Sequence, residues 1–299
     1  ETIAIRSQEP ILLMGRTGVG KTELARRIYQ LKEIKHQVSG RFVEVNCATL
    51  KGDAVMSTLF GHKKGSYTGA LKDRTGLLKE ADKGLIFLDE IGELGLDEQA
   101  MLLRAIEEKV FLPMGSDKEV RSDFQVIAGT NRDLKIQVRA GDFREDLLAR
   151  INLWSFQLPN LRDRKEDIEP NIEFELAKYS KKTGKKIRFT QEAYRAFIKF
   201  AKSPSSAWTG NFRDLNAAIT RMGTMAESGR ISKETVDEEV KTLRSHWLVG
   251  ETQSHSLAVN LLGQQISNYD PFDIAQLEEV LKACQDSRSI SEAGRKLFA

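Results

Sequence analysis

The chain has 299 residues, 40% hydrophobic and 30% charged, which is the composition of a folded globular protein with about two domains. No apolar run approaches the ~18 residues of a membrane-spanning helix, and no signal-peptide pattern opens the chain, so we expect no membrane role. The formal net charge of +3 gives no overall basic character, and any contact with nucleic acid is therefore local. Cys47 and Cys284 form no metal-binding pair, which predicts a reduced, cytoplasmic protein.

Short apolar runs alternate with helical patterns over the first half of the chain. This alternation predicts a parallel sheet with helices on both faces. The chain starts at Glu1 and stops within an amphipathic stretch, so both ends look like cuts in a longer protein. The predicted strands are residues 11–14, 42–45, 85–88, 124–129 and 153–158.

Residues 15–22, GRTGVGKT, follow the first strand and begin the first helix, which is the context that the GxxxxGK[ST] phosphate-binding loop requires. Its glycines let backbone N–H groups point at phosphate oxygens, while Lys21 neutralises phosphate charge and Thr22 offers a hydroxyl to Mg²⁺. The alternative is a fortuitous glycine-rich turn. We expect ATP to be bound by Gly15, Thr17, Gly18, Val19, Gly20, Lys21 and Thr22.

The second strand is followed by Asn46, which is either a polar strand terminus or a group that holds Glu90 away from water. Further along, residues 61–70 read GHKKGSYTGA, with three glycines, two lysines and one aromatic residue. No side chain in this loop is suited to phosphate chemistry. Its glycines suit it to hinge motion, and its alternative is a coincidental surface loop.

The buried-looking strand in residues 84–93 ends in Asp89 and Glu90. Ligands bind at the carboxyl ends of the strands in such sheets, so Asp89 is placed to hold Mg²⁺ and Glu90 to polarise the attacking water. A solvated acidic pair is the alternative, and the phosphate-binding loop argues against it. A later strand ends in Thr130 and Asn131, which are suited to sensing the γ-phosphate or to capping a helix.

Three arginines bear on assembly. Arg144 and Arg150 are six residues apart in a helical stretch, on broadly the same side, where they could reach a nucleotide bound by a neighbouring subunit. The alternative is a solvated helix in which they pair with Glu145 or Asp146. Arg213, at the start of a later helix, is a candidate phosphate contact or a surface charge.

From about residue 159 the pattern is helical only, which predicts a second domain of a different class. We assign residues 1–158 to an α/β nucleotide-binding domain and 159–246 to a small all-helical domain. Residues 247–271 lose both charge and periodicity and are interpreted as a linker. Residues 272–299 are helical again.

Taken in order, these motifs resemble the AAA+ domain of bacterial enhancer-binding proteins, the activators of sigma-54 RNA polymerase. That family carries an insertion, LFGHEKGAFTGA, and residues 59–70 read LFGHKKGSYTGA. The resemblance covers about residues 1–245. It implies an AAA+ P-loop NTPase fold with an α-helical lid, and an ATP hydrolase that forms a homo-oligomeric ring of six or more subunits.

The resemblance also implies roles for particular residues. Asn46 falls at the glutamate-switch position, Asp89 and Glu90 at Walker B, Thr130 and Asn131 at sensor I, and Arg213 at sensor II. Arg144 and Arg150 fall at the arginine-finger positions. The loop that contacts sigma-54 comprises Gly65, Ser66, Tyr67, Thr68, Gly69 and Ala70.

Some residues depart from the family pattern. Tyr67 replaces the phenylalanine at the loop tip and Ser66 replaces an alanine, so the aromatic grip is expected to survive with an added hydroxyl. Residues 107–123 stand where the family places its second insertion. Residues 289–298 resemble the first helix of a Fis-like helix-turn-helix, which implies that the parent protein binds promoter or enhancer DNA.

The loop variants GRTGVGKT and GSYTGA look most like the RtcR subfamily, regulators of an RNA-repair operon. This likeness implies an N-terminal CARF-type RNA-ligand sensing domain outside the present sequence. Two other readings stay open: a remodelling ATPase with another client, such as a chelatase-like or MoxR-like motor, and a nucleotide-gated scaffold without turnover. The intact Asp89 and Glu90 argue against the second.

Overall fold

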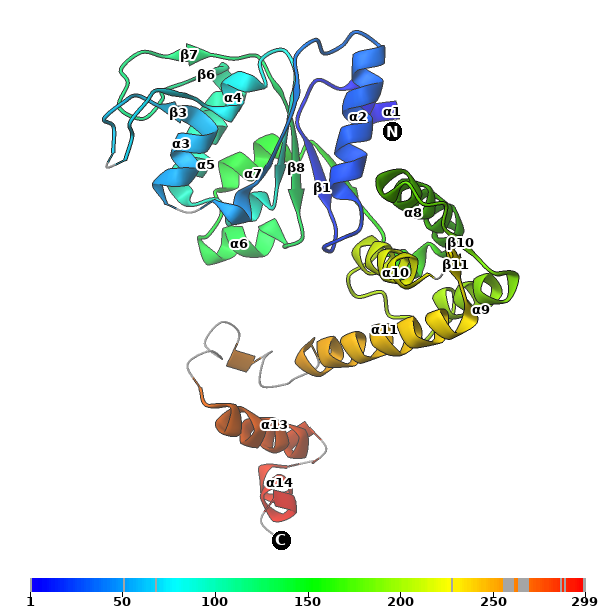
Figure 1. Ribbon diagram of the computed structural model, residues 1–299. Helices are drawn as coiled ribbons and strands as arrows, with labels where there is room; N and C mark the ends of the chain where they lie inside the picture. Colours follow the sequence, from blue (N-terminus) through cyan, green and yellow to red (C-terminus); the bar gives the residue numbers. More distant parts are fainter. Residues whose placement is uncertain are drawn as a thin grey trace. The chain divides into compact units, whose positions relative to one another are not determined.

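The computed structural model describes residues 2–50, 52–67, 69–226, 228–254, 261–262, 269–285, 287 and 289–297 (Figure 1). It divides into two compact units. The first unit comprises Glu1–Arg164 with Gly210–Arg213, and the second comprises Lys165–Thr209 with Asp214–Ala299. The first unit therefore includes a short segment that is distant in sequence.

The first unit is built on a five-stranded sheet in the order β2-β5-β8-β1-β9, and every neighbouring pair is parallel. Four of its strands are rich in branched and aromatic residues, which favours strand formation. Parallel pairing brings the carboxyl ends of all five strands to one edge. The strands are β1 (Ile11–Met14), β2 (Phe42–Asn46), β5 (Leu85–Asp89), β8 (Gln125–Thr130) and β9 (Trp154–Gln157).

Alternate side chains of these strands enter two separate apolar clusters, as the pleat of a β-strand requires. In β5, Leu85 and Phe87 pack with α1 and α2, whereas Ile86 and Leu88 pack against α3, α4, α5, α6 and α7 on the other face. The predicted sheet with helices on both faces is confirmed (Figure 1). The helices are α1 (Thr2–Arg6), α2 (Lys21–Ile34), α3 (Asp53–Phe60), α4 (Leu77–Glu80), α5 (Leu96–Glu108), α6 (Leu134–Ala140) and α7 (Glu145–Ile151).

Two short hairpins project from the first unit between its larger elements. The antiparallel strands β3 (Gly61–His62) and β4 (Arg74–Thr75) flank one, and β6 (Val110–Phe111) and β7 (Val120–Arg121) flank the other. The remaining short elements are the 3₁₀ turns η1 (Cys47–Thr49), η2 (Ile91–Glu93) and η3 (Leu161–Asp163).

Where the structure describes it, the second unit is helical apart from a two-residue parallel pair, β10 (Arg188–Phe189) with β11 (Arg230–Ile231), in a region where the sequence predicts helices alone. Its core stacks Phe200 on Trp247, with Trp208 at the edge of Trp247. Helix α10 starts in the first unit at Phe212. The elements are η4 (Lys165–Asp167), α8 (Ile168–Thr183), α9 (Gln191–Ala201), α10 (Phe212–Met225), α11 (Lys233–Ser254), α13 (Pro271–Gln285) and α14 (Ile290–Leu297).

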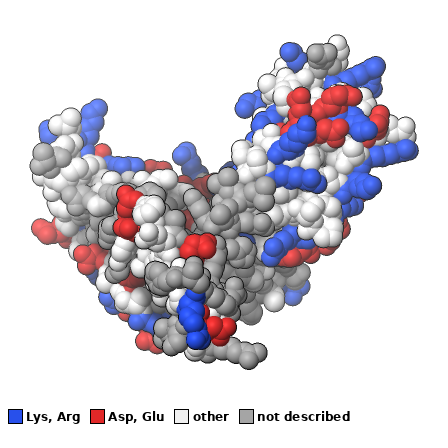
Figure 2. Space-filling model, turned by 90° about the horizontal axis from the view of Figure 1, so that it is seen from below, with Lys and Arg blue, Asp and Glu red and all other residues white. Residues whose placement is uncertain are grey.

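Helix α11 continues to Ser254 and so enters the segment 247–271 that the sequence analysis interprets as a linker. Most of the rest of that segment lies outside the described residues. None of the helices in the described ranges is both long and apolar enough to cross a membrane. On the described part of the face in Figure 2, lysines and arginines are interspersed with aspartates and glutamates.

Candidate nucleotide-binding site

The loop between β1 and α2 has a backbone that only glycine fits at one position. Gly18 has φ +78°, and a Cβ placed there would lie 2.1 Å from the carbonyl oxygen of Gly210. Gly20 also has a positive φ, of +98°, and the Gly15 N–H donates to the Thr130 carbonyl at 3.1 Å. The loop is therefore fixed to β8 on one side and to residue 210 on the other.

Lys21 starts helix α2 and is buried, with 5% of its surface exposed. Its Nζ donates to the Gly15 carbonyl at 2.9 Å and lies 3.6 Å from Oε1 of Glu90. Thr22 follows in the first turn, and Val19 is buried in the apolar cluster beneath α2. The ammonium group is thus enclosed by the loop, where a phosphate group would otherwise be the natural partner.

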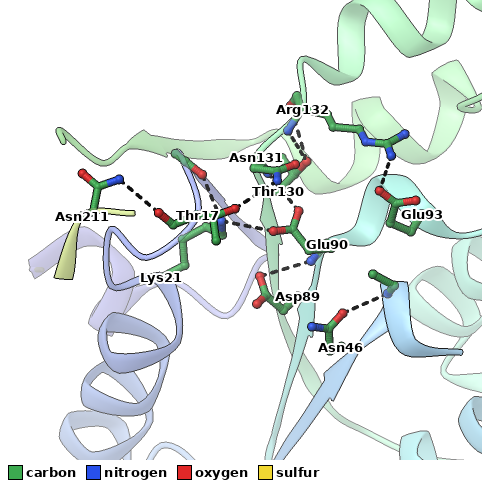
Figure 3. A network of polar contacts seen from close by, with 12 residues as sticks. Thr17, Lys21, Asn46, Asp89, Glu90, Glu93, Thr130, Asn131, Arg132 and Asn211 are labelled. Atoms are coloured by element: carbon green, nitrogen blue, oxygen red, sulfur yellow. Dashed lines mark hydrogen bonds and ion pairs between the residues drawn. The ribbon is translucent and has the colours of Figure 1, made fainter. Parts of the chain in front are cut away.

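The two predicted carboxylates lie where β5 ends (Figure 3). Burial raises the pKa of Asp89, and the charges of Lys21 and Arg213 partly oppose this rise. Glu90 has φ +53°, an uncommon conformation for a residue with a side chain. Its N–H donates to Oδ1 of Asp89 at 3.1 Å. The left-handed turn directs the Glu90 carboxylate toward the phosphate-binding loop.

After β8, the side chain that bonds to the phosphate-binding loop is that of Asn131 and not that of Thr130, whose backbone carbonyl accepts from Gly15. Its backbone N–H donates to Oε2 of Glu90 at 3.1 Å, and its Nδ2 donates to Oγ1 of Thr17 at 3.3 Å (Figure 3). Thr130 is buried, and its hydroxyl accepts from the Arg132 N–H at 3.0 Å. The hydroxyl of Thr130 therefore caps the turn, and the side chain that faces the nucleotide loop is the neighbouring amide.

The structure does not bring Asn46 and Glu90 into hydrogen-bond contact. Asn46 pairs in register with Asp89 on the adjacent strand, but its Oδ1 accepts from the Ala48 N–H at 2.9 Å. It thus caps η1 in this conformation, and its role as a switch for Glu90 stays a prediction.

Three further residues, in or near α10, lie against the phosphate-binding loop. Arg213 lies against the loop, because a Cβ on Gly18 would meet the Arg213 Cβ at 3.2 Å. Asn211, with φ +54°, accepts from the Leu161 N–H at 2.8 Å and donates to the Thr17 carbonyl at 3.0 Å. The Arg164 guanidinium donates to the Val19 carbonyl and lies 4.7 Å from the Phe212 ring centroid.

Neither Asn211 nor Arg164 belongs to a motif that is recognisable in the sequence. Asn211 contacts a residue 194 positions away, and no local spacing signals such a pair. The only local sign is the run of turn-forming residues at 209–211, TGN, before a helical pattern.

Arg144 and Arg150 do not converge. Arg144 precedes α7 and pairs with Asp146 through two hydrogen bonds, of 3.0 and 2.7 Å. Arg150, in the last turn of α7, donates from Nη1 to Oε2 of Glu9 at 2.6 Å. The two arginines thus have different partners, and Arg144 lies just outside the helix, so the expectation that both lie on broadly the same side stays a prediction.

Loop 61–70 closes on itself and on the neighbouring hairpin. The Gly65 N–H donates to the Ala70 carbonyl at 2.8 Å, and the Tyr67 ring meets the buried His62 ring edge-on at 5.2 Å between centroids. Ser66 packs against Gly115 of the second hairpin. Gly65 and Gly69 have positive φ, with open space around a would-be Cβ. Thr68 lies outside the described residues.

Comparison with protein families gives three adjoining matches. The sigma-54 interaction domain matches residues 2–157, the AAA+ ATPase lid domain residues 162–250, and the RtcR C-terminal DNA-binding domain residues 250–299.

Individual relatives agree with these matches. The chain is 57% identical over 298 residues to the transcriptional regulatory protein RtcR of Escherichia coli, which is 100% of this chain and 56% of that protein. It is 39% identical over 226 residues to the Nif-specific regulatory protein of Azotobacter vinelandii, covering 76% of this chain and 42% of the relative. The chain thus spans about half the length of these relatives.

Among solved structures, NtrX from Brucella abortus in complex with ADP aligns with a TM-score of 0.67 and 25% identity, over 93% of this chain and 58% of the NtrX chain. The AAA+ fold predicted from the sequence, a parallel α/β core with a lid, is confirmed. The chain therefore belongs to the sigma-54 interaction domain family and has an AAA+ ATPase fold.

Proposed function

We propose that this chain hydrolyses ATP and uses the energy to remodel the closed complex of RNA polymerase and sigma-54 into the open complex. The observation that carries the proposal is the linked group of Thr17, Lys21, Glu90 and Asn131 at the carboxyl edge of the sheet. A buried ammonium group, a carboxylate and a polar sensor at one edge are the parts that phosphoryl transfer requires.

In this proposal Lys21 leaves the Gly15 carbonyl and neutralises charge on the β- and γ-phosphates. Glu90 accepts a proton from the attacking water, because its carboxylate already faces the loop and is held by the Asn131 N–H. Asn131 reads the presence of the γ-phosphate through its contact with Thr17. Arg213 contributes positive charge beside the same loop.

The residues present fit a magnesium ion held jointly with the nucleotide. Burial disfavours the charged form of Asp89, so a nearby cation would stabilise this carboxylate. Thr22 supplies a hydroxyl at the start of α2. Mg²⁺ in phosphoryl-transfer sites is held by one or two protein ligands together with phosphate oxygens. Mg²⁺ would neutralise charge on the phosphate oxygens.

We further propose that the chain assembles as a ring and that Arg144 and Arg150 act on the nucleotide of a neighbouring subunit. Their exposure, 40% and 31% of each side chain, leaves them accessible to a second chain. Mixing Arg150→Ala subunits with Glu90→Ala subunits tests this arrangement. Partial recovery of hydrolysis is expected, since one partner supplies the arginine and the other the carboxylate; an absence of recovery with intact rings would refute it.

Loop 61–70 is assigned to the contact with sigma-54. It carries no group that acts on phosphate, and its aromatic tip rests on His62 rather than in the apolar core. Tyr67→Ala or Thr68→Ala is expected to retain ATP hydrolysis and to abolish open-complex formation, measured by promoter melting with sigma-54 polymerase. Normal transcription from either variant would remove this assignment.

The wider role is inferred from relatives. The likeness to E. coli RtcR supports regulation of an RNA-repair operon, and the match of residues 250–299 supports promoter or enhancer DNA binding by the whole protein. We retain 1–158, 159–246 and 272–299 as the nucleotide-binding, lid and DNA-binding regions, with 247–271 between them. Loss of operon induction on deleting the full-length gene, restored by the intact gene, is the expected genetic result.

A further inference from the structure

A cavity of 310 Å³ opens at the amino-terminal edge of the sheet, which is the edge opposite the phosphate-binding loop. Residues that precede β1, β5 and β8 line it, together with the end of α7. Its charged groups include Glu9, Lys109, Asp123 and Arg150. The candidate finger Arg150 therefore borders an open cavity rather than a packed core.

Arg150 is held in this cavity by one nitrogen atom. Its Nη1 donates to Oε2 of Glu9 at 2.6 Å, and the described part of the chain offers its Nε and Nη2 no hydrogen bond. A guanidinium group binds phosphate best through two of its nitrogens. The contact with Glu9 thus leaves the phosphate-binding atoms of Arg150 available.

The position of Glu9 is set by the folded core. Its N–H donates to Oγ of Ser7 at 3.1 Å, and the next residue, Pro10, is buried at the entry to β1. The buried Lys32 of α2 donates to the carbonyl oxygens of Ser7 and Ile5. The backbone before β1 is therefore hydrogen-bonded to α2 through Lys32. This contact holds Glu9 in one position relative to Arg150.

A second cation, Lys109, lines the same cavity. Lys109 donates to the Phe124 carbonyl at 2.6 Å and lies 3.7 Å from Oδ1 of Asp123. Burial lowers the pKa of Lys109 most, Arg150 lowers it further, and Asp123 and Glu9 raise it. Each of the two cations thus has a carboxylate beside it, Asp123 for Lys109 and Glu9 for Arg150.

We propose that Glu9 is a positioning residue, which holds Arg150 by Nη1 and so presents its remaining nitrogens to a nucleotide phosphate of the adjacent subunit. The inference rests on the proposed action of Arg150 between subunits. An exposed ion pair adds little to the free energy of unfolding. The proposed role of the Glu9–Arg150 pair is therefore to orient the Arg150 guanidinium group. The chemical unit formed is a carboxylate–guanidinium–phosphate bridge across the interface.

Steady-state kinetics of Glu9→Ala and Glu9→Gln at ring-forming concentration test the proposal. Glu9→Ala is expected to lower kcat about tenfold with KM for ATP unchanged, since its own nucleotide site is intact. Glu9→Gln, which keeps an oxygen acceptor, is expected to lose less. Gln8→Ala, an exposed neighbour on the same cavity, serves as the matched control and should retain full activity.

Subunit mixing separates orientation from damage to the fold. Glu9→Ala subunits mixed with Glu90→Ala subunits should exceed the summed activity of each alone, because the Glu90→Ala chain supplies a correctly held Arg150. Full kcat in Glu9→Ala, or no recovery in this mixture, would overturn the role of Glu9. If Arg150→Ala recovers in the parallel mixture and Glu9→Ala does not, only this inference fails. If neither recovers, the action of Arg150 between subunits fails as well.

Discussion

Different kinds of contact hold the carboxyl edge of the sheet, where the phosphate-binding loop lies, and loop 61–70. At the edge, buried or half-buried groups from β1, α2, β5 and β8 bind one another directly, as Lys21 does with Gly15 and Glu90. Loop 61–70 instead has backbone bonds within itself and to Met114 of the second hairpin, and an edge-on contact between the rings of Tyr67 and His62. The Asp73 carboxylate also accepts hydrogen bonds from the Lys63 ammonium group and the Lys64 N–H. The groups at the edge are thus held in the interior, whereas the bonds from the loop to Asp73 lie at the exposed surface.

Glycines show the same difference. Gly18 and Gly65 have similar φ values, +78° and +82°. A Cβ on Gly18 would collide with Gly210, whereas a Cβ on Gly65 meets nothing within 4 Å. The glycine of the phosphate-binding loop is required by close packing, while that of loop 61–70 is required only by its backbone conformation.

The largest expected effect is on the rate of ATP hydrolysis, from a change at Glu90 on the carboxyl edge of the sheet. Glu90→Gln should lower kcat for ATP hydrolysis by about 10²-fold or more, because the proton acceptor for water is lost. Nucleotide binding should survive, as Lys21 and the loop remain. A coupled phosphate-release assay measures the rate, and Arg26→Ala, at an exposed ion pair with Glu44, is the control. Near-normal turnover would show that another group activates water.

The next largest effect is expected on the free energy of unfolding, when Gly18 or Gly65 is replaced by alanine. Gly18→Ala should lower the free energy of unfolding by more than ~2 kcal/mol or abolish ATP binding, since a clash adds to backbone strain. Gly65→Ala should cost only ~1 kcal/mol and leave hydrolysis intact. Thermal unfolding and a fluorescent ATP analogue report both quantities. Equal losses in the two variants would contradict the difference between the regions.

Asn211→Ala should weaken the edge through a residue outside the predicted motifs. It removes hydrogen bonds to Leu161 and Thr17, and one unsatisfied buried group costs ~1–3 kcal/mol. We expect a lower Tm and a higher KM for ATP, because the loop loses an anchor. Asn211→Gly relieves the positive φ without restoring the bonds, so it should recover stability only in part. Unchanged KM in both variants would make Asn211 purely structural.

The last effect lies away from both regions, at Lys32, and is seen only as the pH is changed. Burial lowers its pKa to about 8 from 10.5, so the folded state disfavours its charge. Below pH 8 the lysine is charged in both states and the cost is fully present. As pH rises from 8 to 10.5 the folded state loses its proton first, and the free energy of unfolding rises by roughly 1–3 kcal/mol. Urea unfolding of Lys32→Met should lack this rise; the same slope in both proteins would contradict it.

Local sequence signals predicted the main strands of the sheet and the helix after the phosphate-binding loop. The predicted strands and the helix over residues 21–34 agree with the structure to within one residue, because β-rich runs and helical periodicity are local properties. The two-residue strands were missed, since partners define them rather than composition. Helix α1 was also not predicted, because it has only five residues and a hydrogen bond from the distant Lys32 to the Ile5 carbonyl helps to hold it.

The candidate site was predictable only where a motif is continuous in sequence. The spacing in residues 15–22 and the pair Asp89–Glu90 pointed directly to the phosphate edge. The choice between Thr130 and Asn131 depends on which way a turn directs two adjacent side chains, which spacing does not encode. The contact of Arg150 with Glu9 joins residues 141 apart and follows from the fold alone.

The central claim is that loop 61–70 binds sigma-54 in a nucleotide-dependent way while the catalytic edge works independently of it. Pull-down of purified sigma-54 with this protein, in ADP and with a mimic of the γ-phosphate transition state, tests it most directly. The account predicts a complex with the mimic, weaker or absent binding in ADP, and no complex with Tyr67→Ala. Active ATP hydrolysis without any sigma-54 complex would contradict it and point to a different client.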